Sequence, residues 1–122
     1  MKVFIVDDST IVVGRLRCLL SEIEGLDFIG QAQSAGDAIK SIIQLKPDAV
    51  ILDIRLAGGD GIKVLEKIKK EKPSPIVIIL TNYPYPQYKR KCEELGADYF
   101  FDKVKEIEKV YDVITQLIKD KP

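Results

Sequence analysis

The segment Val-Phe-Ile-Val-Asp-Asp, residues 3–8, decides the fold, because four consecutive apolar residues end in two carboxylates. Three later apolar runs also end in, or close to, a polar residue suited to phosphate chemistry: 49–52 before Asp53, 76–80 before Thr81, and 99–101 before Lys103. Such short, continuously apolar runs are typical of strands that helices cover on both faces. If they are parallel strands of one sheet, these polar residues share the carboxyl edge, where open α/β sheets bind ligands.

Between these runs the apolar residues follow helical spacing. We expect a helix over 12–23 that ends near Gly25, then a weaker strand at 28–32, polar enough for a sheet edge. Further helices are expected at 34–46, 62–68, 88–95 and 107–118, with a Gly-rich loop at 57–61. Five alternating strand–helix units imply a parallel sheet with right-handed crossovers. We find no linker or repeat, so one domain is expected over 1–122.

The composition excludes several classes of protein. Lysine and arginine number 19, aspartate and glutamate also 19, and histidine is absent, so the basic excess typical of direct nucleic-acid binding is missing. The two cysteines have no metal-ligand spacing. No export signal is recognisable, and no apolar stretch approaches the ~20 residues of a membrane span. We therefore expect a cytoplasmic protein with no membrane contact.

Three carboxylates at one sheet edge need a counter-charge. Two carboxylates about 4 Å apart repel by ~4 kcal/mol at an effective dielectric near 20, so Asp7, Asp8 and Asp53 together would be costly, or one of them would take up a proton. A bound Mg²⁺ removes this cost, since it favours a few carboxylates, waters and a phosphate oxygen. Lys103 adds a positive charge that can meet Asp53 or an incoming phosphoryl group. The set predicts a Mg²⁺-dependent site at which a carboxylate accepts a phosphoryl group.

These residues resemble the receiver domain of two-component response regulators, a signalling family. The resemblance covers the whole chain and rests on residues in a fixed order: Asp7-Asp8, Asp53, Asp60-Gly61, Thr81, Gly96-Ala97-Asp98 and Lys103. It implies a flavodoxin-like (βα)5 doubly wound sandwich with a five-stranded parallel sheet in the order 2-1-3-4-5. It also implies a receiver domain over 1–122, with no output domain in the chain, that acts in signalling and is not an enzyme.

The resemblance assigns a role to each site residue. Asp53 would take a phosphoryl group from a sensor histidine kinase or a phosphotransfer protein. Asp8, Asp53 and the backbone carbonyl of Arg55 would hold Mg²⁺, and Asp7 would assist through water. The remaining roles are contacts to the phosphoryl group by Thr81 and Lys103, and a switch formed by Thr81 and Phe100. Asn82 departs from the family pattern, because a small residue normally stands there; we expect it to line the entry path with Arg55 and Tyr83 and to contact the phosphoryl group.

The switch would alter the face made by the fourth helix, the fifth strand and the fifth helix. That face would then bind a downstream target protein or an output domain, or pair with a second copy as a homodimer. Phosphorylation can shift such an equilibrium only by stabilising one state more than the other.

The chain departs from the family pattern at several places: at Ala57 and Gly59 in the loop after Asp53, at Asn82, at Val104 and in the segment 83–88. Val104 follows Lys103 where the family usually has proline, so we expect a trans peptide bond there. The segment 83–88 carries Tyr83, Tyr85 and Tyr88 between prolines. It is either a docking surface, for which exposed tyrosines are suited, or a prolyl helix entrance with its rings folded onto neighbours.

Other functions remain as alternatives. The chain is either a free-standing receiver or the receiver half of a transcription regulator whose DNA-binding part lies outside it. An aspartate-dependent phosphohydrolase would have two aspartates one residue apart, whereas Asp7 and Asp8 are adjacent and point differently. A flavodoxin-like electron carrier is disfavoured by the carboxylates in the first loop, and a degenerate receiver by the complete acidic set.

Overall fold

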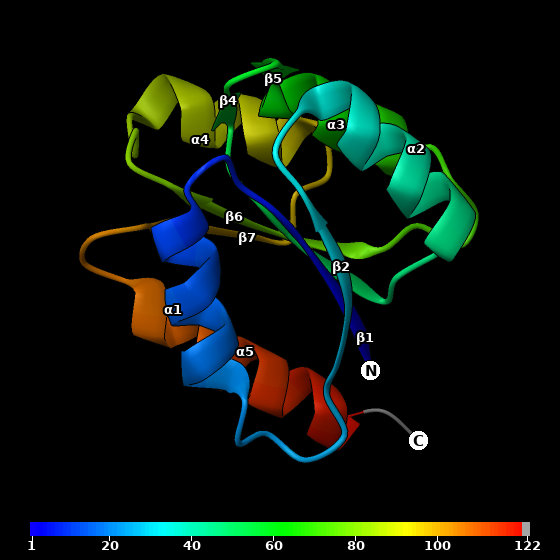
Figure 1. Ribbon diagram of the computed structural model, residues 1–122. Helices are drawn as coiled ribbons and strands as arrows, with labels where there is room; N and C mark the ends of the chain where they lie inside the picture. Colours follow the sequence, from blue (N-terminus) through cyan, green and yellow to red (C-terminus); the bar gives the residue numbers. More distant parts are fainter. Residues whose placement is uncertain (121–122) are drawn as a thin grey trace.

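A five-stranded parallel sheet lies at the centre of the computed structural model, which describes residues 1–120 (Figure 1). Its strands are β1 (Lys2–Val6), β2 (Asp27–Ala32), β3 (Ala49–Leu52), β6 (Ile76–Thr81) and β7 (Tyr99–Asp102). They lie in the order β2-β1-β3-β6-β7, and each neighbouring pair is parallel. Counting only these long strands, the order is the predicted 2-1-3-4-5. The expected α/β sandwich is confirmed, with the weaker strand at an edge.

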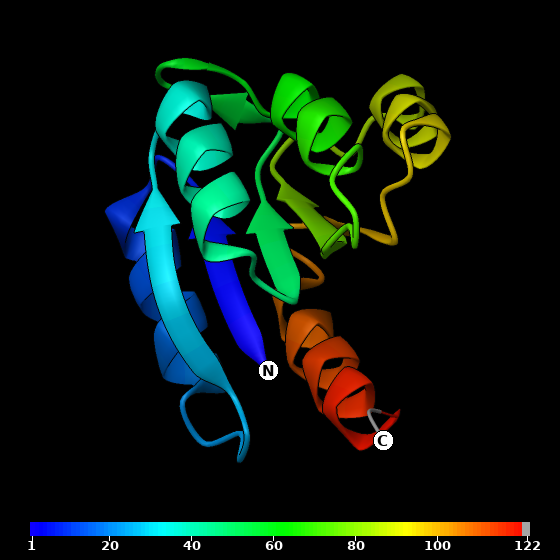
Figure 2. The same ribbon diagram turned by 90° about the vertical axis from the view of Figure 1, so that its right-hand side faces the viewer.

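Five helices cover the two faces of the sheet. Helices α1 (Thr10–Leu20) and α5 (Ile107–Asp120) lie on one face, and α2 (Ala35–Leu45), α3 (Gly61–Ile68) and α4 (Pro86–Glu94) lie on the other (Figures 1 and 2). The strands feed both layers because successive side chains point to opposite faces. In β1, Val3 and Ile5 pack against α1 and α5, while Phe4 and Val6 pack against α2 and α3.

The structure differs from the sequence prediction in two local details. Helix α1 ends at Leu20, because the amide and the hydroxyl of Ser21 both donate to the carbonyl of Cys18. The Gly-rich segment is a small antiparallel hairpin, in which β4 (Arg55–Leu56) pairs with β5 (Gly59–Asp60). The reversal needs the positive φ of 142° at Gly59, which residues with a Cβ rarely adopt.

Gly61 fixes where α3 meets β3. A Cβ at this position would overlap the carbonyl oxygen of Asp53 and would lie 2.7 Å from the Cα of Ile54. The amide of Gly61 donates to the carbonyl of Ile54 at 2.9 Å, and the side chain of Asp60 caps α3 by accepting from the amide of Ile62, also at 2.9 Å. The close approach sets the path of the chain just after Asp53.

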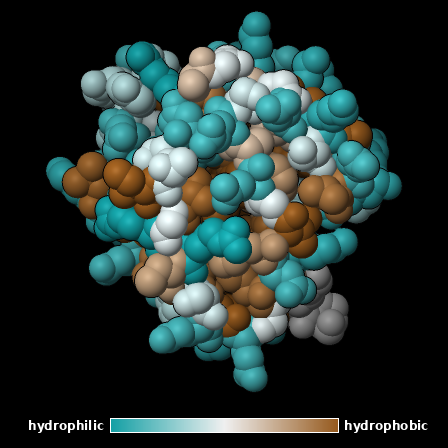
Figure 3. Space-filling model, in the orientation of Figure 1, coloured by the Kyte–Doolittle hydropathy of each residue, from teal (hydrophilic) through white to brown (hydrophobic). Residues whose placement is uncertain are grey.

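The surface is mixed in polarity. On the face shown in Figure 3, hydrophilic side chains predominate and hydrophobic ones are exposed in several patches.

Among residues 1–120, the helices are all too short or too polar to cross a bilayer.

Candidate functional site

The carboxyl edge of the sheet gathers the predicted polar residues. In the described part of the chain, the polar or charged residues classed as buried are Asp7, Asp53, Thr81 and Lys103, each at most 5% exposed. They come from the ends of β1, β3, β6 and β7. A buried charge is costly unless it is paired, so the three charged residues Asp7, Asp53 and Lys103 are expected to lie in contact.

Main-chain hydrogen bonds hold three of these residues at the edge. The amide of Asp7 donates to the carbonyl of Ala32 at 3.1 Å, and that of Asp53 donates to Val6 at 2.9 Å. The amide of Lys103 donates to the carbonyl of Thr81 at 2.8 Å. Each bond joins a site residue to the neighbouring strand, so the register of the sheet positions the side chains.

Lys103 bridges the two buried carboxylates. Its Nζ lies 2.8 Å from Oδ2 of Asp7 and 2.8 Å from Oδ2 of Asp53. The other oxygen of Asp7 accepts from the amide of Ser9 at 2.8 Å, and Oδ1 of Asp53 accepts a longer bond, 3.3 Å, from the amide of Arg55. The expected meeting of Lys103 with Asp53 is present, and the bridge to Asp7 is additional.

Burial shifts the protonation equilibria here. The pKa of Asp7 is raised, chiefly because burial disfavours the carboxylate, although bonds from Lys103 and Ser9 oppose this. For Lys103 burial is the largest single effect and lowers the pKa, but the hydrogen bonds and charges of Asp53 and Asp7 together outweigh it and raise the pKa. One ammonium therefore stabilises two carboxylates. At Asp7 this stabilisation does not fully offset the effect of burial, so the pKa of Asp7 stays raised.

Asp8 completes an acidic cluster on the solvent side. It is exposed, and the carboxylates of Asp7, Asp8 and Asp53 each offer an oxygen within 4.8 Å of the others. Opposite oxygens of a Mg²⁺ shell with 2.1 Å bonds lie about 4.2 Å apart, so the cluster is close to the required span. Three carboxylates against one lysine leave an excess of negative charge. In donor type, spacing and charge, these residues fit a small divalent cation.

Thr81, Asn82 and Phe100, the other predicted residues, occupy three different environments. Thr81 is fully buried, and its Oγ1 accepts from the amide of Tyr83 at 3.1 Å, whereas Asn82 is exposed. Phe100 is half-buried and packs against the core on the α2–α3–α4 side. Within residues 1–120 the cis peptide bond is Lys72–Pro73, so Lys103–Val104 is trans, as predicted.

Beside the site, an arginine and three tyrosines form a second group, the Arg55 cluster: Arg55, Tyr83, Tyr85 and Tyr88. The guanidinium carbon of Arg55 lies 4.3 Å from the ring centre of Tyr83, and Nη2 donates to the Tyr88 hydroxyl at 3.2 Å. Tyr85 lies between them, with ring centres 6.4 Å from Tyr83 and 5.8 Å from Tyr88. The rings are folded onto neighbours, yet Tyr85 remains 50% exposed, so each reading of the segment 83–88 keeps support.

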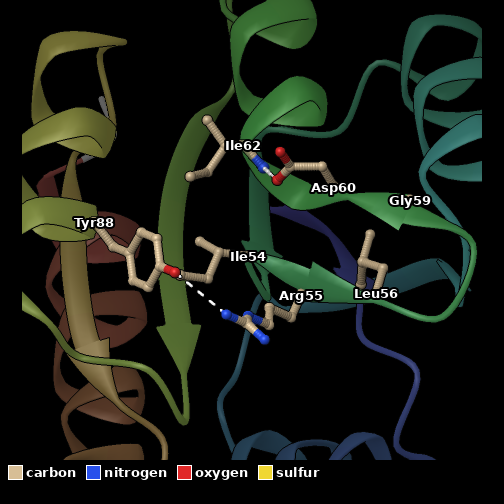
Figure 4. A pocket seen from close by; sticks show the side chains of 7 residues that line it. All are labelled: Ile54, Arg55, Leu56, Gly59, Asp60, Ile62 and Tyr88. Carbon is tan, nitrogen blue, oxygen red and sulfur yellow. Dashed lines mark hydrogen bonds between the residues drawn. The ribbon is translucent and has the colours of Figure 1, made fainter.

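Arg55 and Tyr88 also line a hollow of about 320 Å³ next to the site (Figure 4). The other lining residues are Ile54, Leu56, Gly59, Asp60 and Ile62. Figure 4 shows the Arg55 side chain reaching from the hairpin toward Tyr88 on α4, with the hydrogen bond closing the gap between them.

Besides the bridge from Lys103 to Asp7, the sequence analysis missed two features of this edge. It gave no role to Ser9, whose amide binds Asp7 and whose side chain caps α1 by accepting from Val12 at 3.2 Å. A serine at the start of an apolar helical pattern is a recognisable signal of such a cap. It also missed the bond from Arg55 to Tyr88, for which a separation of 33 residues gives no local signal.

Comparison with known proteins gives a consistent family. The model of the response regulator receiver domain matches residues 3–115. Among curated proteins, the chain is 33% identical over 121 residues to the transcriptional regulatory protein YvfU of Bacillus subtilis, covering 99% of this chain and 60% of that protein. It is 32% identical over 103 residues to the DNA-binding transcriptional activator EvgA of Escherichia coli K12, covering 84% of this chain and 50% of that protein. The chain thus spans half to three-fifths of these two relatives.

A solved structure shows the same architecture. The isolated receiver domain of RcsB from Salmonella enterica serovar Typhimurium, in the presence of the phosphomimetic BeF3⁻, superposes with a TM-score of 0.88 at 27% identity. The match covers 99% of this chain and 90% of that one.

Proposed function

Because the chain belongs to the response regulator receiver domain family, we propose that it is a phosphoacceptor signalling domain of a two-component system, phosphorylated on Asp53. The observation that carries this proposal is the contact of Lys103 Nζ with both Asp7 and Asp53 at 2.8 Å. It joins residues from separate strand ends into one buried site, next to an exposed carboxylate. We propose that the domain covers residues 1–122.

The transfer needs a donor and no base from this chain. A carboxylate oxygen of Asp53 forms a bond to phosphorus while the bond from phosphorus to the histidine nitrogen of a kinase or phosphotransfer protein breaks. That nitrogen keeps the electron pair, and the product is an acyl phosphate. Lys103 balances charge on the phosphoryl oxygens, and the Thr81 hydroxyl donates to one of them. Asn82, exposed beside Thr81, would contact the group as it enters.

Mg²⁺ would be held by Asp8, Asp53 and the backbone carbonyl of Arg55, with Asp7 acting through water. When bound, it supplies positive charge to the acidic cluster and to the transferring phosphoryl group. The excess of carboxylates over lysine at this edge supports a divalent cation.

The proposed output is a change of surface. When Thr81 turns toward the phosphoryl group it gives up the bond from the amide of Tyr83, and Phe100 moves into the vacated space. The face formed by α4, β7 and α5 then presents a different surface to a target protein, an output domain or a second copy. We propose a signalling role without enzymatic turnover, and a location in the cytoplasm, where such kinases act.

A second candidate is the receiver half of a longer DNA-binding regulator. It is favoured by the fraction of the relatives that the chain spans, since EvgA is named as a DNA-binding activator and is twice the length of the matched part. In that case the partner of the switched face would be the rest of the same protein.

The test is to incubate the chain with a small acyl phosphate, with and without Mg²⁺, and to measure its mass. We expect a gain of one phosphoryl group that requires the metal and disappears in Asp53→Asn. Asp98→Asn is the matched control, because Asp98 lies at the other end of the strands, where it binds the amide of Val77 and Lys69. Modification of Asp53→Asn, or none of the unaltered chain, would contradict the proposal.

A further inference from the structure

The Arg55 cluster forms a closed circuit of contacts. Arg55 lies over Tyr83, Tyr83 contacts Tyr85, Tyr85 contacts Tyr88, and Tyr88 accepts the hydrogen bond from Arg55. The circuit joins the β4–β5 hairpin to the segment that begins α4. Proline at 84 and at 86 stiffens that segment, so movement at Tyr83 carries over to the first turn of α4.

Two members of the circuit are also joined directly to the phosphoacceptor site. Arg55 follows Asp53 by two residues and Tyr83 follows Thr81 by two. The amide of Arg55 donates to Asp53 Oδ1 at 3.3 Å, and the amide of Tyr83 donates to Thr81 Oγ1 at 3.1 Å. The two residues that pair by a cation–π contact are therefore bonded to the two side chains that change on phosphorylation.

We propose that Arg55 is a latch: its bond to Tyr88 holds the first turn of α4 against the hairpin, and an anion on Asp53 draws the guanidinium away and releases that turn. The proposal rests on the proposed function, because the anion is the aspartyl phosphate.

The competition between the two partners of Arg55 favours release. In the unphosphorylated chain the guanidinium has a neutral phenol hydroxyl and an aromatic face as partners. In the bond from Arg55 to Tyr88 only the guanidinium is charged. Between arginine and a phosphate both groups are charged and the contact is often bidentate, so the phosphate is the stronger partner. Arg55 is exposed, so apart from its contact with the Tyr83 ring little packing opposes the movement. Lys103 competes for the same anion but is already shared between two carboxylates.

The construction of α4 confines the release to its start. Tyr85, at the N-cap position, makes no side-chain capping bond, so that turn is held by the bond from Arg55 to Tyr88 and by the Tyr88 ring, which packs against the core and contacts Tyr85. The second half of the helix is anchored by Cys92, which is fully buried in the core. Opening the latch therefore loosens one end of α4, beside the hollow shown in Figure 4, without detaching the helix.

Hydrogen exchange of the first-turn amides tests the latch. The amides of Tyr88 and Lys89 both donate to the carbonyl of Tyr85, at 3.0 and 3.1 Å. We expect their exchange to quicken about fivefold when the chain is phosphorylated with a small acyl phosphate and Mg²⁺, as for the loss of one hydrogen bond of modest net strength. In Tyr88→Phe, exchange should already be about fivefold faster before phosphorylation, and phosphorylation should add little.

Tyr85→Phe is the matched control, since it also removes one hydroxyl from the cluster but leaves the Arg55–Tyr88 bond in place; it should behave as the unaltered chain does. Tyrosine emission gives a second readout, because the chain has no tryptophan and three of its five tyrosines lie in the cluster. In a Tyr99→Phe, Tyr111→Phe background, the emission should change in step with the gain in mass.

The outcomes separate the two proposals. A gain in mass with unchanged first-turn exchange would overturn the latch and leave the phosphoacceptor function standing. Equal responses of Tyr88→Phe and the unaltered chain would also overturn the latch. If the chain gains no phosphoryl group, the proposed function is wrong. The latch is then wrong as well, because the anion that would draw Arg55 away does not form.

Discussion

Two groups of side chains meet at the same edge of the sheet, and they are built differently. The site residues Asp7, Asp53 and Lys103 are almost fully buried and joined by two ion pairs of 2.8 Å. The Arg55 cluster lies beside them and consists of ring contacts and one hydrogen bond of 3.2 Å. Arg55 and Tyr85 are exposed in it, and Tyr83 and Tyr88 are partly buried against the core.

This difference in burial indicates which contacts the fold holds in one arrangement. Buried charges have no alternative partner in water, so removing one member leaves the others at a high free energy. Members of an exposed cluster can exchange their partners for solvent at little cost. The buried group should therefore resist rearrangement, and the exposed group should respond to small changes in charge. The predictions below test this difference.

The largest effect is expected from Lys103→Met. The substitution leaves the carboxylates of Asp7 and Asp53 buried without their common partner, and we expect the free energy of unfolding to fall by about 4 kcal/mol. Urea denaturation at pH 7 measures this. The control is Lys69→Met, which breaks the more exposed pair with Asp98 and should cost about 1 kcal/mol. Equal losses in the two variants would show that burial makes no difference here.

Gly61→Ala should destabilise by about 2–3 kcal/mol. Its Cβ would overlap the carbonyl of Asp53, so either β3 or the start of α3 must shift. Gly36→Ala is the matched control, because a Cβ at that position in α2 meets nothing within 4 Å, and alanine there should stabilise by about 0.5–1 kcal/mol. Both values come from thermal or urea unfolding, and a tolerated Gly61→Ala would mean that the loop after Asp53 is not constrained.

Alkaline pH should weaken the buried anchor of α4. Burial, with a smaller effect from Asp60 and Glu93, raises the pKa of the Cys92 thiol from 9.0 to about 11. Between these values the unfolded chain loses the proton and the folded chain keeps it, so stability falls as pH rises through this range, by up to about 3 kcal/mol.

Lys103, whose pKa is also raised, acts in the same direction at still higher pH, so variants are needed to separate the two. Unfolding curves from pH 8 to 11 should show a shallower slope in Cys92→Ala. Cys18→Ala, which alters the exposed cysteine, should keep the slope of the unaltered chain. If the slope is unchanged in Cys92→Ala, the loss of stability with rising pH comes from a group other than Cys92.

The smallest effect is expected in the exposed cluster. Tyr85 is 50% exposed, so Tyr85→Ala should change the free energy of unfolding by only about 0.5 kcal/mol and leave phosphorylation of Asp53 intact. As a docking residue, its loss should instead weaken binding to a partner protein. A stability loss as large as that of Lys103→Met would place Tyr85 with the buried group and end the distinction.

The sequence predicted the parallel sheet because the apolar runs are long enough to mark strands covered on both faces. The order of the strands was predicted from the resemblance to receiver domains. The sequence also predicted which residues meet, since Asp7, Asp53 and Thr81 directly follow such runs and parallel strands share one carboxyl edge. Burial of these residues together with Lys103 accords with that grouping. Their chemical roles stay predictions.

What could not be predicted depends on the path of loops and on exposed side chains. The β4–β5 hairpin follows from the positive φ at Gly59, which glycine permits but does not require. The Arg55–Tyr88 bond needs the relative placement of a hairpin and a helix 33 residues apart. The second partner of Lys103 was missed because Asp7 and Asp8 are equivalent in sequence, and only the turn after β1 decides which one faces inward.

The amides of Asp7, Asp53 and Lys103 are each bonded to the adjoining strand, which gives the chain a built-in check on its own folding. A strand threaded one position out of step would turn its polar residue to the opposite face and scatter the charges. A misfolded copy would then lack the grouped charges of the proposed phosphoacceptor site. It could not be phosphorylated, and so it could not act as if it were activated.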